Sequence, residues 1–141
     1  MNLLSSGLTL SPTQWSQIKA EVSSRQNEEA CGLLAGVGNL TSLVIPITNI
    51  LHDPYRFRMD PKEELIALQL IEEKGYEVLA VYHSHPNGLQ RPSPTDYAEL
   101  TFSGIIYLIL FPEGYDWQCR GYYMQSQGEA GEVPVTISDN A

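Results

Sequence analysis

Two of the three histidines in this 141-residue chain, His83 and His85, stand two residues apart where an apolar run passes into a loop. Side chains at positions i and i+2 of a strand point to the same face, so both imidazoles can reach one ion while Ser84 points away. A catalytic zinc ion usually has three protein ligands and one open position. Asp96, in the first turn of the helix expected after the loop, is the best third ligand, because two nitrogens and a carboxylate suit zinc.

Each part of this pattern also has an ordinary structural explanation. A His-x-His pair is common on its own, and the Ser-Pro-Thr-Asp sequence at residues 93–96 is typical of a helix cap. Similar helix starts occur at residues 11–14 and 60–63, where no chemistry is attached. The third histidine, His52, precedes an Asp-Pro turn signal and is interpreted as structural or solvent-exposed.

The complete spacing is more specific than its parts. Residues 83–96 read His-x-His-x7-Ser-x2-Asp, with His-Ser-His-Pro at the start and Pro-Ser-Pro-Thr-Asp at the end. This pattern resembles the JAMM motif of the MPN+ (Mov34/MPN/PAD-1) zinc metalloproteases, in a compact prokaryotic-type form. The resemblance extends from about Leu8 to Met124, and no motif position departs from it. It implies a zinc ion held by His83, His85 and Asp96.

The family's remaining element is a glutamate far upstream, three residues before a glycine in an apolar run. In the Glu-Glu-Ala-Cys-Gly sequence at residues 28–32 this spacing selects Glu29. Glu28 is the alternative candidate for this glutamate; if it does not have that role, it is interpreted as a solvated loop carboxylate. The resemblance implies that Glu29 takes the proton of the attacking water and passes it to the leaving amine without binding zinc. The hydroxyl of Ser93 would donate to the developing oxyanion as well as cap its helix.

The elements that position these residues follow from caps and apolar runs. Helices are predicted from residue 12 to about 24, from 61 to a cap at Gly75, and from 94 over a short length. Strands are predicted at 31–37, 40–47, 55–59, 77–83, 105–111, 116–124 and 133–138. This order predicts an α/β fold with a mixed, mostly antiparallel sheet flanked by helices. By resemblance it is a single MPN/JAMM domain over residues 1–141 with cytidine-deaminase-like layering, a core at about 8–124 and an undecided tail at 125–141.

Composition limits the partners and the compartment. With a net charge of -9 the domain repels phosphate backbones, so nucleic acid is not expected as a partner. No apolar run approaches the roughly 20 residues that cross a bilayer, and residues 1–9 lack the charge and apolar block of a secretory signal. Cys31 and Cys119 lie in apolar strand-like runs and are interpreted as buried free thiols. A cytoplasmic location is therefore expected.

The resemblance implies hydrolysis of an amide bond at the C-terminal tail of a ubiquitin-like protein, held by β-addition to a strand edge. For a compact chain the favoured partner is a small sulfur-carrier protein, from which an amino acid such as cysteine, or a fused segment, is released. A polyubiquitin deubiquitinase ranks lower, because the chain has no long insertion near the motif to hold a second ubiquitin. A non-catalytic MPN scaffold module for protein–protein contact predicts a broken metal triad, and here the triad is intact.

Two other zinc chemistries lack their motifs, and several surface residues stay undecided. Nucleobase deamination requires His-x-Glu with Pro-Cys-x-x-Cys, zincin proteases require His-Glu-x-x-His, and the sequence contains neither motif.

Arg91, in the loop after the histidines, either contacts a substrate carboxylate or is solvated. Tyr55, Arg56 and Arg58 lie either on a strand surface or in a groove. The apolar strands allow a homodimer but do not require one.

Overall fold

One mixed sheet runs through the computed structural model, which describes residues 7–125 and 128–139. Its strands are β1 (Leu8–Leu10), β2 (Cys31–Val37), β3 (Leu40–Ile47), β4 (Glu77–Ser84), β5 (Ile106–Glu113), β6 (Asp116–Gln125), β7 (Glu129–Val133) and β8 (Val135–Ile137). The helices are α1 (Pro12–Ser23), α2 (Pro61–Glu73) and α3 (Pro94–Ala98).

The strand order β7-β6-β5-β4-β2-β3-β1-β8 places β4, which carries the two histidines, in the middle of the sheet. Four pairings are antiparallel, namely β2 with β3, β2 with β4, β5 with β6 and β6 with β7. Three are parallel, namely β4 with β5 and β1 with both β3 and β8. The predicted mixed, mostly antiparallel sheet is therefore confirmed.

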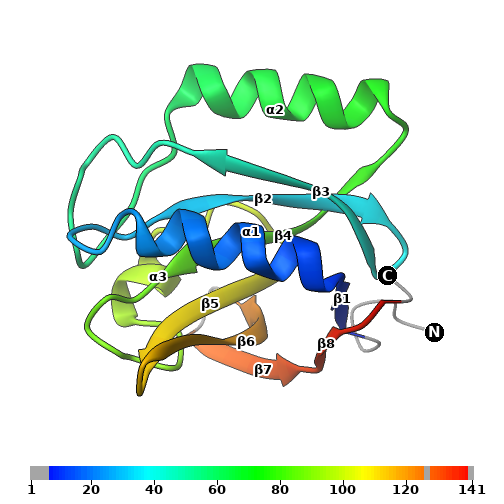
Figure 1. Cartoon of the computed structure of the whole chain (residues 1–141). Helices are drawn as coiled ribbons and strands as arrows, with labels where there is room; N and C mark the ends of the chain where they lie inside the picture. Colours follow the sequence, from blue (N-terminus) through cyan, green and yellow to red (C-terminus); the bar gives the residue numbers. More distant parts are fainter. Residues whose placement is uncertain (1–6, 126–127, 140–141) are drawn as a thin grey trace.

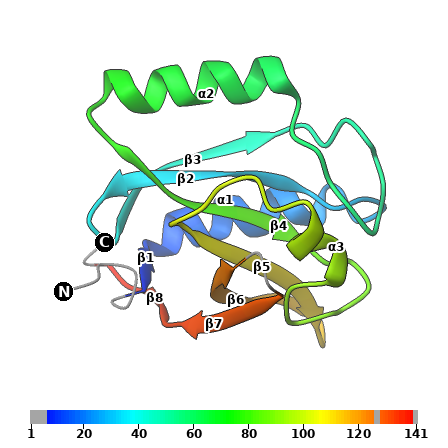
Figure 2. The same ribbon diagram turned by 180° about the vertical axis from the view of Figure 1, so that it is seen from behind.

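Helices α1 and α2 cover opposite faces of this sheet (Figures 1 and 2). Side chains alternate between the faces along the central strands, as strand geometry requires. Leu33, Val81 and Ile109 join the core under α2, and their even-numbered neighbours Leu34, Tyr82 and Leu108 join the core under α1. His83 continues the series of Val81, so its side chain emerges on the α2 side of the sheet.

All three helices of the described chain begin at the predicted caps. Ser11 and Ser93 each form a capping box with the residue three positions later, and Asp60 accepts two backbone N–H groups of the first turn of α2. Helix α2 is followed by Gly75, whose φ of +72° is the left-handed conformation that commonly ends a helix.

Two segments depart from the predicted strands. The prediction of a strand at 55–59 is wrong, because backbone groups there bond to the side chain of Asn49, and only an isolated bridge joins Asn49 to Met59. Residues 133–138 were predicted as one strand, but Pro134 has no N–H and separates β7 from β8. The short β1 and most of β7 were not predicted; each is too short or too polar to show a pattern.

The structure bears on the expectations about a membrane span and about the two cysteines. Within residues 7–125 and 128–139, no helix is long and apolar enough to cross a membrane. The first six residues of the segment considered as a secretory signal lie outside the described residues. Both cysteines are free thiols, Cys31 fully buried and Cys119 partly exposed.

Candidate metal centre

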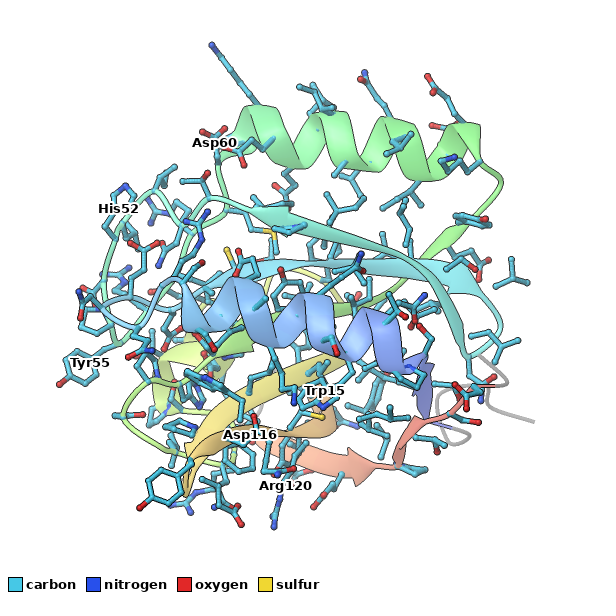
Figure 3. All side chains as sticks on the ribbon, in the orientation of Figure 1. Trp15, His52, Tyr55, Asp60, Asp116 and Arg120 are labelled. Carbon is cyan, nitrogen blue, oxygen red and sulfur yellow. The ribbon has the colours of Figure 1, made fainter. Side chains whose placement is uncertain are left out.

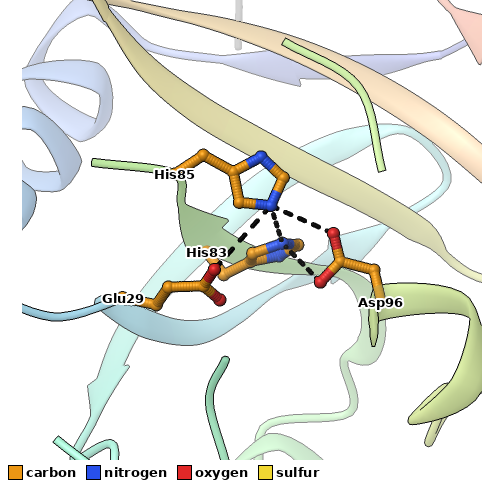
Figure 4. A group of neighbouring side chains, drawn as sticks. All are labelled: Glu29, His83, His85 and Asp96. Carbon is orange, nitrogen blue, oxygen red and sulfur yellow. Dashed lines mark hydrogen bonds and ion pairs between the residues drawn. The ribbon is translucent and has the colours of Figure 1, made fainter. Parts of the chain in front are cut away.

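Four side chains with metal-binding atoms meet where β2 begins and β4 ends (Figure 4). They are Glu29, His83, His85 and Asp96, all buried, and one ligand atom from each lies within 4.8 Å of the others. In Figure 4 the two carboxylates flank the histidine rings from opposite sides. The structure thus brings together the three predicted ligands and the predicted base.

The antiparallel pairing of β2 with β4 brings Glu29 to the histidines. Cys31 pairs with His83, and beyond it the N–H of Ser84 donates to the carbonyl of Ala30 at 3.0 Å. The Oγ of Ser84 accepts the N–H of Ala30 at 2.8 Å, across 54 residues of sequence. Glu29, one residue earlier, therefore lies opposite the residue that follows Ser84. Ser84 points away from the imidazoles as predicted, but its role in fixing this register was not predicted.

Asp96 reaches the cluster from the first turn of α3, where it also caps the helix. The N–H of Ser93 donates to Oδ2 of Asp96 at 2.8 Å, and the N–H of Asp96 donates to Oγ of Ser93 at 3.1 Å. The carboxylate oxygens lie 3.0 Å from Nε2 of His85 and 3.2 Å from Nε2 of His83. The predicted helix cap is therefore confirmed, and the same cap orients the carboxylate toward the histidines, so that capping and metal binding are compatible at Asp96.

A backbone carbonyl selects the tautomer of His85. Its Nδ1 lies 2.9 Å from the carbonyl oxygen of Leu89, and because a carbonyl can only accept, Nδ1 carries the proton. In the neutral ring Nε2 then presents a lone pair to the cluster, which is how metal-binding histidines are commonly arranged. The hydroxyl of Tyr122 on β6 donates to the carbonyl of Gln90 at 2.9 Å and so holds the same loop. The sequence carries no signal for this contact.

His83 is held by stacking and is kept neutral by burial. Its ring lies 4.8 Å from that of Phe57, at an interplanar angle of 29°. Burial lowers the pKa of His83, although the neighbouring charge of Asp96 opposes this. Its Nδ1 has no hydrogen-bond partner among the described residues, while its Nε2 lies 3.2 Å from Nε2 of His85.

The two carboxyl groups have opposite protonation preferences. Burial, followed by the charge of Asp96, raises the pKa of Glu29 to about 9. Burial acts in the same direction on Asp96, but His83, His85 and the N–H of Ser93 outweigh it and hold its pKa well below the usual range. Oε1 of Glu29 is buried without a hydrogen-bond partner in the described chain, an arrangement that costs free energy unless a cation is near.

These donors fit zinc. The Nε2 atoms of His83 and His85 and the nearest oxygens of Asp96 lie 3.0 to 3.2 Å from one another. Ligand atoms arranged tetrahedrally around zinc are about 3.3 Å apart, given zinc–ligand distances of about 2.0 to 2.1 Å. Together with the unpartnered oxygen of Glu29, the cluster is compatible with zinc binding.

The other candidate residues lie outside the cluster. Glu28 accepts from His52 at 2.8 Å and lies 3.5 Å from Arg25, so it is paired rather than solvated. The side chain of His52 is largely exposed, which agrees with its predicted structural or solvated role (Figure 3). Arg91 is exposed in its loop.

Asn49 is a buried residue whose role was not predicted. Its Nδ2 donates to the carbonyls of Glu29 at 2.9 Å and Arg56 at 3.1 Å. Its Oδ1 accepts the N–H groups of Leu51 and Arg58, each at 3.1 Å. One side chain thus fastens the loop after β3 to the backbone of Glu29. An Asn that ends a strand before a Pro-containing loop is the only signal for it in the sequence.

The sequence of this chain is similar to those of several known proteins. The family described as prokaryotic homologs of the JAB domain matches residues 12–120. A desampylase of Haloferax volcanii is 35% identical over 89 residues, which cover 61% of this chain but only 64% of that relative, less than two thirds of its length. A desampylase of Pyrococcus furiosus is 29% identical over 126 residues, covering 89% of this chain and 88% of the relative. A CysO-cysteine peptidase of Mycobacterium tuberculosis is 29% identical over 113 residues, covering 78% and 77%.

Solved structures also resemble this chain. The solution structure of a protein from Desulfitobacterium hafniense is 29% identical and covers 94% of this chain and 93% of its own, with a TM-score of 0.83. A JAB1/MPN domain protein from Archaeoglobus fulgidus covers 93% of this chain and 99% of its own with a TM-score of 0.57; at 22% identity it shows the fold alone. The motif, the fold and the match over residues 12–120 lead to one conclusion: the chain belongs to the prokaryotic homologs of the JAB domain, a JAMM/MPN family.

Proposed function

We propose that this chain is a zinc-dependent peptidase or isopeptidase that hydrolyses an amide bond at the C-terminal tail of a ubiquitin-like protein, foremost a small sulfur carrier. The observation that carries the proposal is the buried group of Glu29, His83, His85 and Asp96, which combines a zinc-compatible triad with a second carboxylate. Relatives named desampylase and CysO-cysteine peptidase support a substrate of the ubiquitin-like sulfur-carrier class.

In this proposal His83, His85 and Asp96 hold the metal through their Nε2 and carboxylate atoms. Burial lowers the pKa of His83 and so favours its neutral form, and the carbonyl of Leu89 directs the Nε2 of His85 toward the cluster. A bound zinc ion would supply the Lewis acidity that lowers the pKa of water to about 7.

Glu29 is the proposed proton carrier. A nearby cation lowers the pKa of a carboxyl group, so a group whose pKa is about 9 in the bare protein is brought toward the neutral range that suits a base. The water oxygen adds to the amide carbon, its proton moves to Glu29 and then to the leaving nitrogen, and the C–N bond breaks. The products are a carboxylic acid on the ubiquitin-like tail and a free amine.

Ser93 is the proposed oxyanion donor. Its Oγ accepts the N–H of Asp96 in the helix cap, which leaves its own O–H available to donate. Loss of one such donor lowers a rate by roughly 10² to 10³.

The test is the trimming of ubiquitin-like sulfur carriers that carry C-terminal extensions, followed by mass spectrometry. We expect the extension to be removed, the reaction to stop with a chelator, and activity to return with zinc. Diubiquitin in parallel distinguishes a polyubiquitin deubiquitinase, and a scaffold module would cleave neither substrate. Full activity in a preparation shown to be free of metal would disprove the proposal.

Location and assembly are part of the proposal. Free thiols at Cys31 and Cys119 support the reducing cytoplasm as the compartment. A homodimer and the lack of a nucleic-acid partner stay predictions, which size-exclusion chromatography and a DNA-binding titration would check.

A further inference from the structure

Glu28 and Glu29 are neighbours in the sequence, but their carboxylates lie on opposite sides of the chain. Glu29 belongs to the metal-binding cluster, whereas Glu28 contacts Arg25, which follows α1. The next two residues continue the alternation, because Ala30 joins the core under α1 and Cys31 joins the core under α2. A slip of one residue in this segment would exchange the two carboxylates. The contacts that hold Glu28 in place therefore also hold Glu29 in the cluster.

Two side chains hold the carboxylate of Glu28. Nδ1 of His52 donates to its Oε2 at 2.8 Å, and Nη1 of Arg25 lies 3.5 Å from its Oε1. Nε of Arg25 lies 3.2 Å from the carboxylate of Glu21 on α1, so the guanidinium is itself held on its other side. One support thus comes from the end of α1 and the other from the loop after β3.

The same loop binds the backbone of Glu29 on both sides. The N–H of Glu29 donates to the carbonyl of Asp53 at 2.9 Å, and its carbonyl accepts Nδ2 of Asn49 at 2.9 Å. His52 stands between these two residues in the sequence and adds the hydrogen bond to Glu28. One short turn therefore fixes both glutamates, one through its side chain and the other through its backbone.

His52 has a backbone conformation that is uncommon outside glycine. Its φ of +48° lies in the left-handed region, and no other non-glycine residue within 7–125 and 128–139 has a positive φ. Such conformations cost free energy and are concentrated at functional sites. The N–H of His52 donates to the carbonyl of Asn49 at 3.2 Å and closes the turn, and the ring contacts Glu28. The left-handed turn thereby brings the ring to this carboxylate.

We infer that His52 and Glu28 are a positioning pair for Glu29, in which the held carboxylate of Glu28 keeps that of Glu29 turned into the cluster. The inference rests on the proposed function, where Glu29 carries the proton, and adds two residues outside the metal-binding group. Exposed ion pairs contribute little to stability, and the ring of His52 is largely exposed. A misplacement of about 1 Å, by contrast, can lower a rate by roughly 10². The pair should therefore affect turnover more than folding.

The experiment measures kcat, KM and zinc affinity with a sulfur carrier that has a C-terminal extension. His52→Gly keeps the left-handed turn and removes the ring, and Glu28→Ala removes the carboxylate. We expect each substitution to lower kcat roughly five- to tenfold with KM and zinc affinity unchanged, because only the proton carrier is displaced. The double variant should lose little more than either single variant, since the effects of residues that act as a unit are not additive.

Two further measurements separate positioning from a general loss of structure. Added imidazole should restore part of kcat in His52→Gly, because the ring that it replaces is 64% exposed and its place is open to solvent. Glu132→Ala on β7 is the matched control, since Glu132 forms an exposed ion pair with Arg120, and it should change neither kcat nor zinc affinity. Wild-type kcat in both single variants, or kcat and zinc affinity lowered alike, would overturn the inference.

Amide hydrogen exchange of the purified protein tests the pair without a substrate. The N–H of Glu29 is bonded to Asp53, so its exchange rate reports how firmly this segment is held on the loop. Both single variants should speed this exchange roughly fivefold, while the N–H of Leu33, inside β2, keeps its wild-type rate. If the wild type cleaves no substrate but this difference is seen, the proposed function fails and the positioning pair stands. Unchanged exchange at Glu29 in both variants contradicts the pair.

Discussion

At the scale of single residues, each group in the cluster is oriented by a neighbour outside it. Leu89 selects the tautomer of His85, Phe57 stacks on His83, and Ser93 fixes the carboxylate of Asp96. Such support reduces the reorganisation needed when a metal or substrate binds. The roles of these neighbours differ from those of the donors, so substitutions should separate metal binding from proton transfer.

Glu29→Gln should keep zinc and lose turnover, because the amide cannot accept the proton and His83, His85 and Asp96 are intact. Asp96→Asn should lose metal, since it removes the only charged donor of the triad. Metal content by mass spectrometry of the purified proteins, set beside kcat, separates the two effects. Loss of zinc from Glu29→Gln would show that Glu29 is a ligand rather than a base.

Asn49→Ala should destabilise the fold and impair the site. It leaves two carbonyls and two N–H groups without their partner, and each unsatisfied buried group costs about 1 to 3 kcal/mol. Because water can reach the part-buried groups, we expect a loss of about 2 to 4 kcal/mol in the free energy of unfolding, measured with urea. Asn39→Ala, in the turn between β2 and β3, is the control and should lie within about 0.5 kcal/mol of the wild type.

At the scale of elements, local signals were reliable and distant pairings were not visible. The capping sequences predicted where α1, α2 and α3 begin, because caps are local chemistry. The approach of Glu29 to the histidines depends on the register of β2 against β4, which no pattern within either strand specifies. Only the family spacing indicated it. The failed strand at 55–59 has the same origin, since a distant side chain, Asn49, takes its backbone bonds.

Tyr122→Phe tests how the sheet supports the histidine loop. The substitution removes the hydrogen bond from β6 to Gln90 and leaves the buried ring in place. The loop that carries Leu89 should loosen, so His85 is less well oriented and zinc affinity falls several-fold, with about 1 kcal/mol lost in unfolding free energy. Competition with a coloured chelator measures the affinity. Tyr123→Phe, with no described hydroxyl bond, should match the wild type.

At the scale of the whole molecule, the cluster places two carboxylates and two imidazoles inside an acidic protein. Without a cation, Glu29 is accommodated largely as the neutral acid, which is what its raised pKa expresses. A ligand that binds only the folded state stabilises it in proportion to the logarithm of its concentration over its dissociation constant. Zinc removal should therefore lower the melting temperature, and what remains should depend on pH.

The stability of the zinc-free protein should fall as pH rises through the neutral and mildly alkaline range. Glu29 has a pKa of about 9 when folded and an ordinary value of 4.5, so above about pH 5 the unfolded chain releases a proton that the folded chain keeps. That difference favours unfolding more strongly at each higher pH, by at most about 1.4 kcal/mol per pH unit, until the pH passes the folded pKa.

The lowered pKa of His83 acts on the stability in the opposite direction, but only below about pH 7. Burial raises the thiol pKa values of Cys31 and Cys119 from 9.0, so their effects start higher. The window from pH 7 to 8.5 thus isolates Glu29. Urea unfolding in chelator should show a decline there for the wild type and a flat profile for Glu29→Gln. A decline that persists in the variant would assign the effect to another group and contradict the buried, cation-dependent carboxylate on which the site depends.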